Sequence, residues 1–191
     1  MNCKILSLLF CISFIVSCNS TNNQPPLETV KDTTNFYPLN VMLDNQLADL
    51  QRSPFYIYKK TTINNKMVDS IAFPLDSLYK VIQQFKQYNI DTVGKKEYYT
   101  ESSFQDLSTN SISLVYTTTN SNMEVINQTI LLNQDNNNLK NALVRVIQKG
   151  TNYQIQYNFK PNKSLRISTI KQQNGSEDVV ENVFINWNDT E

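Results

Sequence analysis

The 191-residue sequence contains no histidine, only three glycines and no excess of charge of either sign. Without histidine the chain lacks the commonest general base at neutral pH, the commonest zinc ligand and the central member of a Ser-His-Asp arrangement. Gly94, Gly150 and Gly175 are too far apart to form a phosphate-binding loop. Because basic and acidic residues both number 17, no basic field attracts nucleic acid. We expect no metal, no cofactor and no nucleic-acid partner.

Cysteine is also scarce. The three cysteines are Cys3, Cys11 and Cys18. The rest of the chain therefore forms no internal disulfide and offers no thiol nucleophile. Residues 1–17 have the parts of a secretory signal peptide: Lys4 supplies a positive charge, residues 5–16 are largely apolar, and Ser17 is small. As a helix, the apolar run reaches about 18 Å, which is short of a bilayer core of about 30 Å. The segment is expected to target the chain rather than to span a membrane.

The stretch Ile15-Val16-Ser17-Cys18 resembles the lipobox of bacterial lipoproteins. The resemblance implies cleavage between Ser17 and Cys18, a diacylglyceryl group on the Cys18 thiol and, usually, acylation of the new amino terminus. Two or three acyl chains, at about 0.8 kcal/mol per buried methylene, give a practically permanent membrane anchor. The alternative is a signal peptide without lipidation, in which the cysteine falls here by chance.

The residues after the cysteine indicate where the anchored protein lies. Asn19 stands where inner-membrane lipoproteins of Gram-negative bacteria have Asp, and this favours the outer membrane. Surface-exported lipoproteins of the Bacteroidota resemble one another in an acidic cluster at this point, and residues 19–24 contain none. We therefore expect the periplasmic face of the outer membrane. Residues 18–35 are polar and contain Pro25-Pro26, which is typical of a flexible tether.

Residues 36–191 are expected to form a single α+β domain. Leucines near helical spacing predict an amphipathic helix within residues 38–50. A second helix is predicted over residues 74–85, with one apolar face made by Leu75, Leu78, Tyr79, Ile82 and Phe85. Residues 54–62 and 66–73 are strand-like and flank a turn at Ile63-Asn64-Asn65-Lys66, which predicts a hairpin.

The second half of the domain is strand-rich. Six strand-like runs, at residues 111–119, 123–132, 141–149, 153–159, 164–172 and 177–187, are separated by clusters of turn-forming residues. Residues 91–109 are ambiguous, and only Ser103–Leu107 is read there as a short strand. The prediction is an antiparallel β-meander of about six to eight strands, packed on one face by two or three helices.

A further resemblance covers much of the domain. "FYPLNVMLDNQLADLQRSPF" and the later "NVFINW" resemble uncharacterised outer-membrane lipoproteins of the Bacteroidota. These share an aromatic-x-Pro opening, a Leu-rich helix with a Gln-Leu pair and a Trp near the end. The resemblance implies the fold and the envelope location, and it implies no activity and no functional residue.

Carboxylates are the strongest remaining acid–base candidates, and a glycosidase needs two of them about 5–10 Å apart. The candidates are Asp69, Asp76, Glu97, Glu101 and Asp106. The alternative is that these acids are solvated, with Asp76 in the first turn of its helix. The polar run at residues 134–139 lacks the glycine and glutamate of an EF-hand, so a hairpin turn is favoured over a calcium loop.

Two surface features complete the candidate sites. Aromatic residues could line a binding face or belong to the core and its rim; they are Tyr56, Tyr58, Tyr79, Tyr98, Tyr99, Tyr153, Tyr157 and Trp187. Asp followed by Ser or Thr and then an aliphatic residue or Thr is similar to the O-glycosylation signal of Bacteroidota periplasmic proteins. That similarity implies glycans on Thr33, Ser70, Ser77 or Thr92; for each, a chance match is the alternative.

Three hypotheses for function follow. The leading hypothesis is a non-catalytic, lipid-anchored envelope domain that binds a protein or polymer. The first alternative is a carrier that holds an apolar ligand between a curved sheet and its helices. The second alternative is a carboxylate-dependent hydrolase that acts on envelope glycans. A cavity, an exposed binding face or a pair of converging acids would distinguish the three.

Overall fold

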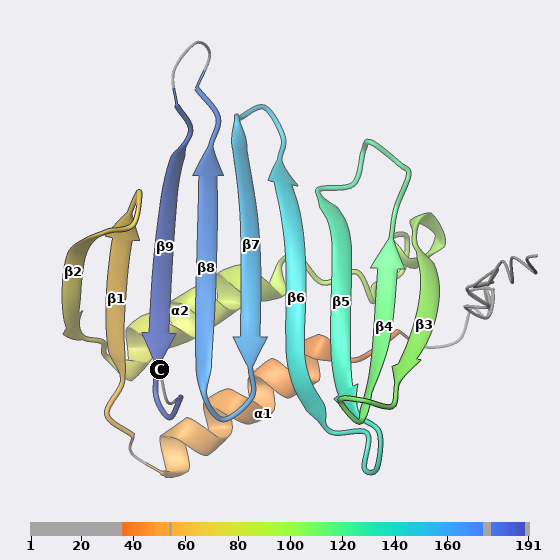
Figure 1. Cartoon of the computed structure of the whole chain (residues 1–191), viewed down its shortest axis with the longest axis horizontal. Helices are drawn as coiled ribbons and strands as arrows, with labels where there is room; N and C mark the ends of the chain where they lie inside the picture. Colours follow the sequence, from red (N-terminus) through yellow and green to blue (C-terminus); the bar gives the residue numbers. More distant parts are fainter. Residues whose placement is uncertain (1–35, 54, 174–176, 190–191) are drawn as a thin grey trace, which may run out of the picture.

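The computed structural model describes residues 36–53, 55–173 and 177–189. The predicted signal peptide, Cys18, the tether and Thr33 lie outside these residues. The described chain forms one nine-stranded antiparallel sheet with helices behind it (Figure 1). The strands are β1 Tyr58–Ile63, β2 Lys66–Ala72, β3 Thr100–Asp106, β4 Ser111–Thr117, β5 Val125–Asn133, β6 Leu139–Gln148, β7 Tyr153–Lys160, β8 Ser164–Lys171 and β9 Val179–Asn186. Their order across the sheet is β2-β1-β9-β8-β7-β6-β5-β4-β3.

This architecture confirms the predicted α+β class and the antiparallel meander. The sheet has nine strands rather than six to eight. Strand β3 spans Thr100–Asp106 and is longer than the predicted Ser103–Leu107. The strand is at an edge of the sheet and pairs only with β4, so its sequence TESSFQD lacks the apolar alternation of a half-buried strand.

Two α-helices, α1 Leu39–Arg52 and α2 Leu75–Lys86, lie on the same face of the sheet (Figure 1). A short 3-10 helix, η1, spans Lys96–Tyr98. Pro38 and Pro74 stand at the N-caps of α1 and α2, where their missing N–H groups cost no helical hydrogen bond. The ring of Phe85 stacks on Tyr157 of β7, with centroids 4.6 Å apart and planes 7° apart. This stack fixes α2 against the centre of the sheet.

The predicted apolar face of α2 is wrong at one position. Leu78, Ile82 and Phe85 are buried, but the side chain of Tyr79 is 48% exposed. At 100° per residue, Tyr79 lies roughly 90° around the helix from the centre of the buried stripe. It therefore faces solvent rather than the sheet.

Asparagine residues close several of the turns. Asn64 and Asn65 have positive φ angles of 47° and 64° in the β1–β2 hairpin, which confirms the predicted turn. The predicted polar turn at residues 134–139 is also confirmed as the β5–β6 connection. In it Asn137 has a φ of 56°, its N–H donates to the Asn133 carbonyl, and the Asn133 side chain accepts from Asp135 N. Asparagine tolerates this left-handed region better than other residues with a side chain.

The alternation of side chains along each strand produces two different faces. The face under the helices carries the core, which includes Leu43, Leu78, Ile82, Tyr116, Ile130, Val144, Phe159, Leu165 and Ile185. The opposite face, here called the open face, is the nearer one in Figure 1, and neither helix lies on it. Since paired residues share a face, the strand registers identify which side chains lie there.

Candidate functional site: the open face of the sheet

The open face is organised in rows that run across the strands. One row consists of Thr62, Asn182, Ser168, Gln156, Arg145, Asn127, Thr117 and Thr100, and is here called the polar row. It crosses eight strands, from β1 to β3. At about 4.8 Å between strands, the row is about 34 Å long. Every member has a hydroxyl, amide or guanidinium group, and none is fully buried. A row of this composition can form hydrogen bonds along an extended polar ligand.

Basic side chains are concentrated on the same face. Lys60 of β1, Arg166 of β8, Lys160 of β7 and Arg145 of β6 all occupy open-face positions. Among the described strand residues that the register places on this face, the acidic one is Asp106, at the end of edge strand β3. The whole chain has a formal net charge of zero. The excess of basic side chains on this face therefore results from the way in which the strands pair. Lys160 is paired with Asp189, so the positive charge at the centre of the open face comes from Arg145 and Arg166.

An aromatic ring lies beside the polar row. Phe184 of β9 is only 8% exposed although it is on the open face. The Arg166 guanidinium lies over its ring, 4.8 Å from the centroid, and Tyr58 approaches it edge-on at 6.4 Å. The cation–π contact and the Tyr58 ring cover this apolar surface. The cation–π contact with Phe184 also holds the Arg166 side chain in place at the surface.

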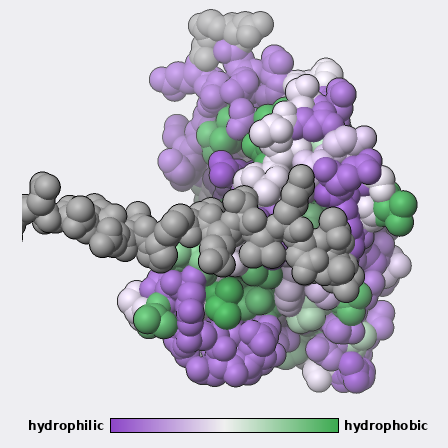
Figure 2. Space-filling model, turned by 90° about the vertical axis from the view of Figure 1, so that its right-hand side faces the viewer, coloured by the Kyte–Doolittle hydropathy of each residue, from purple (hydrophilic) through white to green (hydrophobic). Residues whose placement is uncertain are grey.

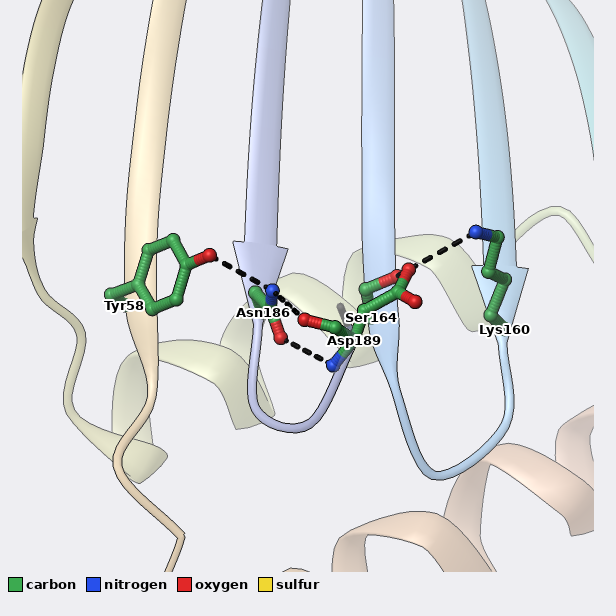
Figure 3. Close-up of polar contacts among 5 residues, drawn as sticks. All are labelled: Tyr58, Lys160, Ser164, Asn186 and Asp189. Carbon is green, nitrogen blue, oxygen red and sulfur yellow. Dashed lines mark hydrogen bonds and ion pairs between the residues drawn. The ribbon is translucent and has the colours of Figure 1, made fainter. Parts of the chain in front are cut away.

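A polar cluster lies where β7, β8 and β9 meet the C-terminal residues (Figure 3). The Asp189 carboxylate accepts hydrogen bonds from Ser164 Oγ at 2.9 Å and Lys160 Nζ at 3.1 Å. The Asn186 amide donates to the Tyr58 hydroxyl at 2.9 Å and to the Asp189 carbonyl at 2.8 Å, and it accepts from Asp189 N at 2.7 Å. Together these contacts attach the residues after β9 to the sheet.

The electrostatics of this cluster favour a structural role. The Asp189 side chain is only 7% exposed, and burial by itself raises the pKa of its carboxyl. The hydrogen bonds from Lys160 and Ser164, with the charge of Lys163, outweigh burial and lower the pKa below its ordinary value. A carboxylate with a lowered pKa is a weak general base at neutral pH. The arrangement of Ser164, Lys160 and Asp189 is therefore unsuited to activating the serine.

The carboxylates proposed for hydrolysis on the strands do not converge. Glu101 and Asp106 are five residues apart on β3, about 17 Å along the strand, whereas a glycosidase pair needs about 5–10 Å. Asp69 lies on β2, at the opposite edge of the sheet from β3, and pairs with Lys59 at 3.2 Å.

The other two acids are at the surface. Asp76 is exposed in the first turn of α2, as predicted, and Glu97 is exposed in η1. Asp106 accepts hydrogen bonds from Ser108 and Thr109, which lower the pKa of its carboxyl.

Within the described ranges, no three His, Cys, Asp or Glu side chains come together as a metal site.

The candidate aromatic residues do not form one face. Tyr99, Tyr157 and Trp187 are buried, whereas Tyr56, Tyr79 and Tyr98 are exposed. Tyr58 lies on the open face, and Tyr153 lies on the helix side beside Lys171. The Tyr99 hydroxyl donates to the Val125 carbonyl at 2.8 Å, and burial raises the pKa of Tyr99 to about 12.

Three of the proposed glycosylation sites are described. Ser70 is exposed on edge strand β2, and Thr92 is exposed in the loop after α2. Ser77 is partly buried in the first turn of α2. Whether any of them carries a glycan stays a prediction.

No motif in the sequence marks Arg145 or Arg166 as functional residues. Each alternates with buried aliphatic residues, in "LVRVI" and "SLRIS", so each occupies the outward position of a half-buried strand. That alternation is the signal by which both could have been found. It does not predict that they share a face with Lys60, which depends on the pairing of β1 with β9.

Figure 2, which looks toward the edge of the sheet at β3, shows a hydrophilic surface interrupted by hydrophobic patches. In the part of the chain that the structure covers, no helix is both long and apolar enough to cross a bilayer.

Comparisons with protein-family models, with curated proteins and with solved structures found no match.

Proposed function

We propose that this protein is a lipid-anchored, non-catalytic domain of the cell envelope whose open face binds an acidic polysaccharide. The polar row carries the proposal. Its amide and hydroxyl groups suit the hydroxyl groups of a sugar chain, and the guanidinium groups of Arg145 and Arg166 suit its carboxylates. The location rests on the lipobox-like sequence at Cys18 and remains an expectation.

The composition of the polar row favours a polysaccharide over a protein partner. Stable protein interfaces have an apolar core enriched in aromatic residues and Met, and they are depleted of Lys. The polar row is instead made of amides, hydroxyls and the Arg145 guanidinium, and the Phe184 ring beside it is covered by Arg166. Apolar side chains, among them Leu143, Val115 and Ile147, share the open face on either side of the row. A polymer that runs along the polar row could contact several strands at once.

The packing between the sheet and the helices favours this function over a carrier of apolar ligands. Leu43 of α1 and Leu78 and Ile82 of α2 have no exposed surface, and Phe85 stacks directly on Tyr157. Side chains thus fill the space that a carrier would need for its ligand. Two surface pockets lie at opposite ends of α2, one beside Leu75 and one beside Tyr88, and both are open to solvent.

Binding to immobilised polygalacturonate, a carboxylated polysaccharide, tests the proposal, with neutral dextran as the control ligand. We expect binding to polygalacturonate that weakens as salt is raised, since exposed charges are screened. The double variant Arg145→Gln/Arg166→Gln should bind at least tenfold more weakly.

The matched control is Lys80→Gln/Lys149→Gln, which removes two exposed cations outside the open-face rows. Thermal unfolding of both variants checks that they are folded. Equal losses in the two double variants, or equal binding to dextran, would contradict the proposal. Capture of a protein instead of the polymer would also contradict it.

A further inference from the structure

A third pocket lies at the end of the sheet, between α1 and the β7–β8 turn. Its volume is about 360 Å³, which is within the usual range for small-molecule sites. Gln46, Asp49 and Arg52 of α1 line it, with Phe55, Asn162 and Trp187. None of these residues belongs to the polar row, so this pocket is distinct from the open-face site.

The tryptophan in this pocket has an unused hydrogen-bond donor. The Trp187 side chain packs beside Phe159, with ring centroids 6.5 Å apart, and Trp187 is only 4% exposed. Its indole Nε1 is buried and has no hydrogen-bond partner within the described chain. Buried donors in folded proteins are nearly always paired with protein, water or ligand. The indole N–H therefore needs an acceptor from outside the described residues.

The neighbouring polar groups are mainly donors. The Gln46 side chain is 5% exposed, and its Oε1 accepts from Asn162 N at 2.5 Å, which leaves its amide N–H groups as donors. Arg52 donates to the Ala48 carbonyl at 3.2 Å and to Asp49 Oδ1 at 2.7 Å. These bonds occupy two of its five N–H groups. Indole, amide and guanidinium N–H groups together complement an acceptor with two oxygens.

We propose that this pocket binds a carboxylate-bearing small molecule or chain end. The carboxylate accepts hydrogen bonds from the Arg52 guanidinium and, once a small movement of the pocket wall uncovers it, from the buried Trp187 Nε1, and the adjoining part of the ligand packs on the 43%-exposed Phe55 ring. Asp49 pairs with Arg52 and opposes a second negative charge. Replacing this acid by its amide is therefore expected to strengthen binding.

Trp187 provides the assay, because it is the single tryptophan of the sequence. The purified full-length protein, in mild detergent, is titrated with N-acetylalanine or glucuronate, while Trp187 emission is recorded. The first probe represents a peptide end and the second a uronic acid, so the tighter binder identifies the source of the carboxylate. N-acetylalaninamide and glucose are the uncharged controls.

We expect a saturable emission change with at least one carboxylate, at a dissociation constant on the order of 1 mM, and none with the uncharged controls. Arg52→Gln should weaken binding at least fivefold, and Asp49→Asn should strengthen it. Lys80→Gln, which removes an exposed cation on α2 outside both sites, is the matched control and should leave binding unchanged. Trp187→Phe keeps an aromatic ring without the donor, and calorimetry should show weaker binding by this variant.

Two results would overturn the proposal. One is the absence of a saturable change with both carboxylates, which would mean that water alone satisfies the indole N–H. The other is equal binding of the charged and uncharged probes. Neither result affects the proposed function, since polymer binding depends on Arg145 and Arg166, and Arg52→Gln should leave it intact.

Discussion

Replacing Phe85 by alanine should remove the main contact between α2 and the sheet. Phe85 is only 2% exposed, and its ring stacks on Tyr157 at 4.6 Å. Truncation of a buried phenylalanine costs about 3–5 kcal/mol through lost burial and the cavity that remains. Since domains are stable by only about 5–15 kcal/mol, Phe85→Ala should remove a large part of the stability. Urea unfolding followed by circular dichroism should show a midpoint lower by about 2 M with an unchanged slope.

Tyr79→Ala is the matched control on the same helix. Tyr79 is 48% exposed, so its truncation should change the free energy of unfolding by less than about 0.5 kcal/mol. The sequence pattern places both residues on one buried face, whereas the structure separates them. Equal losses of stability in the two variants, or a larger loss for Tyr79→Ala, would refute the packing of α2 described here.

Three further predictions concern the C-terminal cluster, the anchor and the core tyrosines. Asp189→Asn should lower stability by about 1–2 kcal/mol at neutral pH. Because the folded pKa of Asp189 is lowered, this contribution is present above the unfolded value of about 3.9 and is lost as pH falls through the folded pKa; urea unfolding of both proteins from pH 7 to pH 2 checks it. Cys18→Ser should move the protein from the membrane fraction to the soluble fraction of its native host and remove the mass of the acyl chains, as measured by fractionation and intact-mass spectrometry. Burial raises the pKa of Tyr116 and Tyr157, so stability should be constant below the unfolded pKa of about 10 and fall as pH rises above it, and Tyr157→Phe should reduce that fall in alkaline unfolding experiments.

Much of the fold could be predicted because its signals are local. The β1–β2 turn follows from Asn64-Asn65, two residues that tolerate positive φ angles. The alternation of Tyr153, Ile155, Tyr157 and Phe159 with polar residues predicts one packed and one solvated face for β7, and Phe85 stacks on its packed face. These patterns depend on neighbours within a few residues of one another.

Features set by strand order could not be predicted. Edge strand β3 carries little apolar alternation, because only one side of it is paired and its face is largely exposed. The positive open face depends on the pairing of β1 with β9, which places Lys60 in the same row as Arg166, more than 100 residues away. A count of charges shows balance and gives no sign of that segregation.

The candidate pocket at Trp187 also depends on distant contacts. The sequence identifies Trp187 only as one of several aromatic residues near strands. Its pocket forms because the β7–β8 turn lies against α1, where Gln46 accepts from Asn162 N. Those two residues are separated by 116 positions, so no local pattern relates them.

Binding of an acidic polysaccharide to the open face can be tested in intact cells of the native host. A photo-cross-linking amino acid replaces Gln154, which is exposed on the open face, or Gln84, which is exposed on α2, as the control. After illumination, we expect the Gln154 variant to give adducts containing uronic acids and the Gln84 variant to give none. Adducts made only of protein, or equal yields from the two positions, would contradict it.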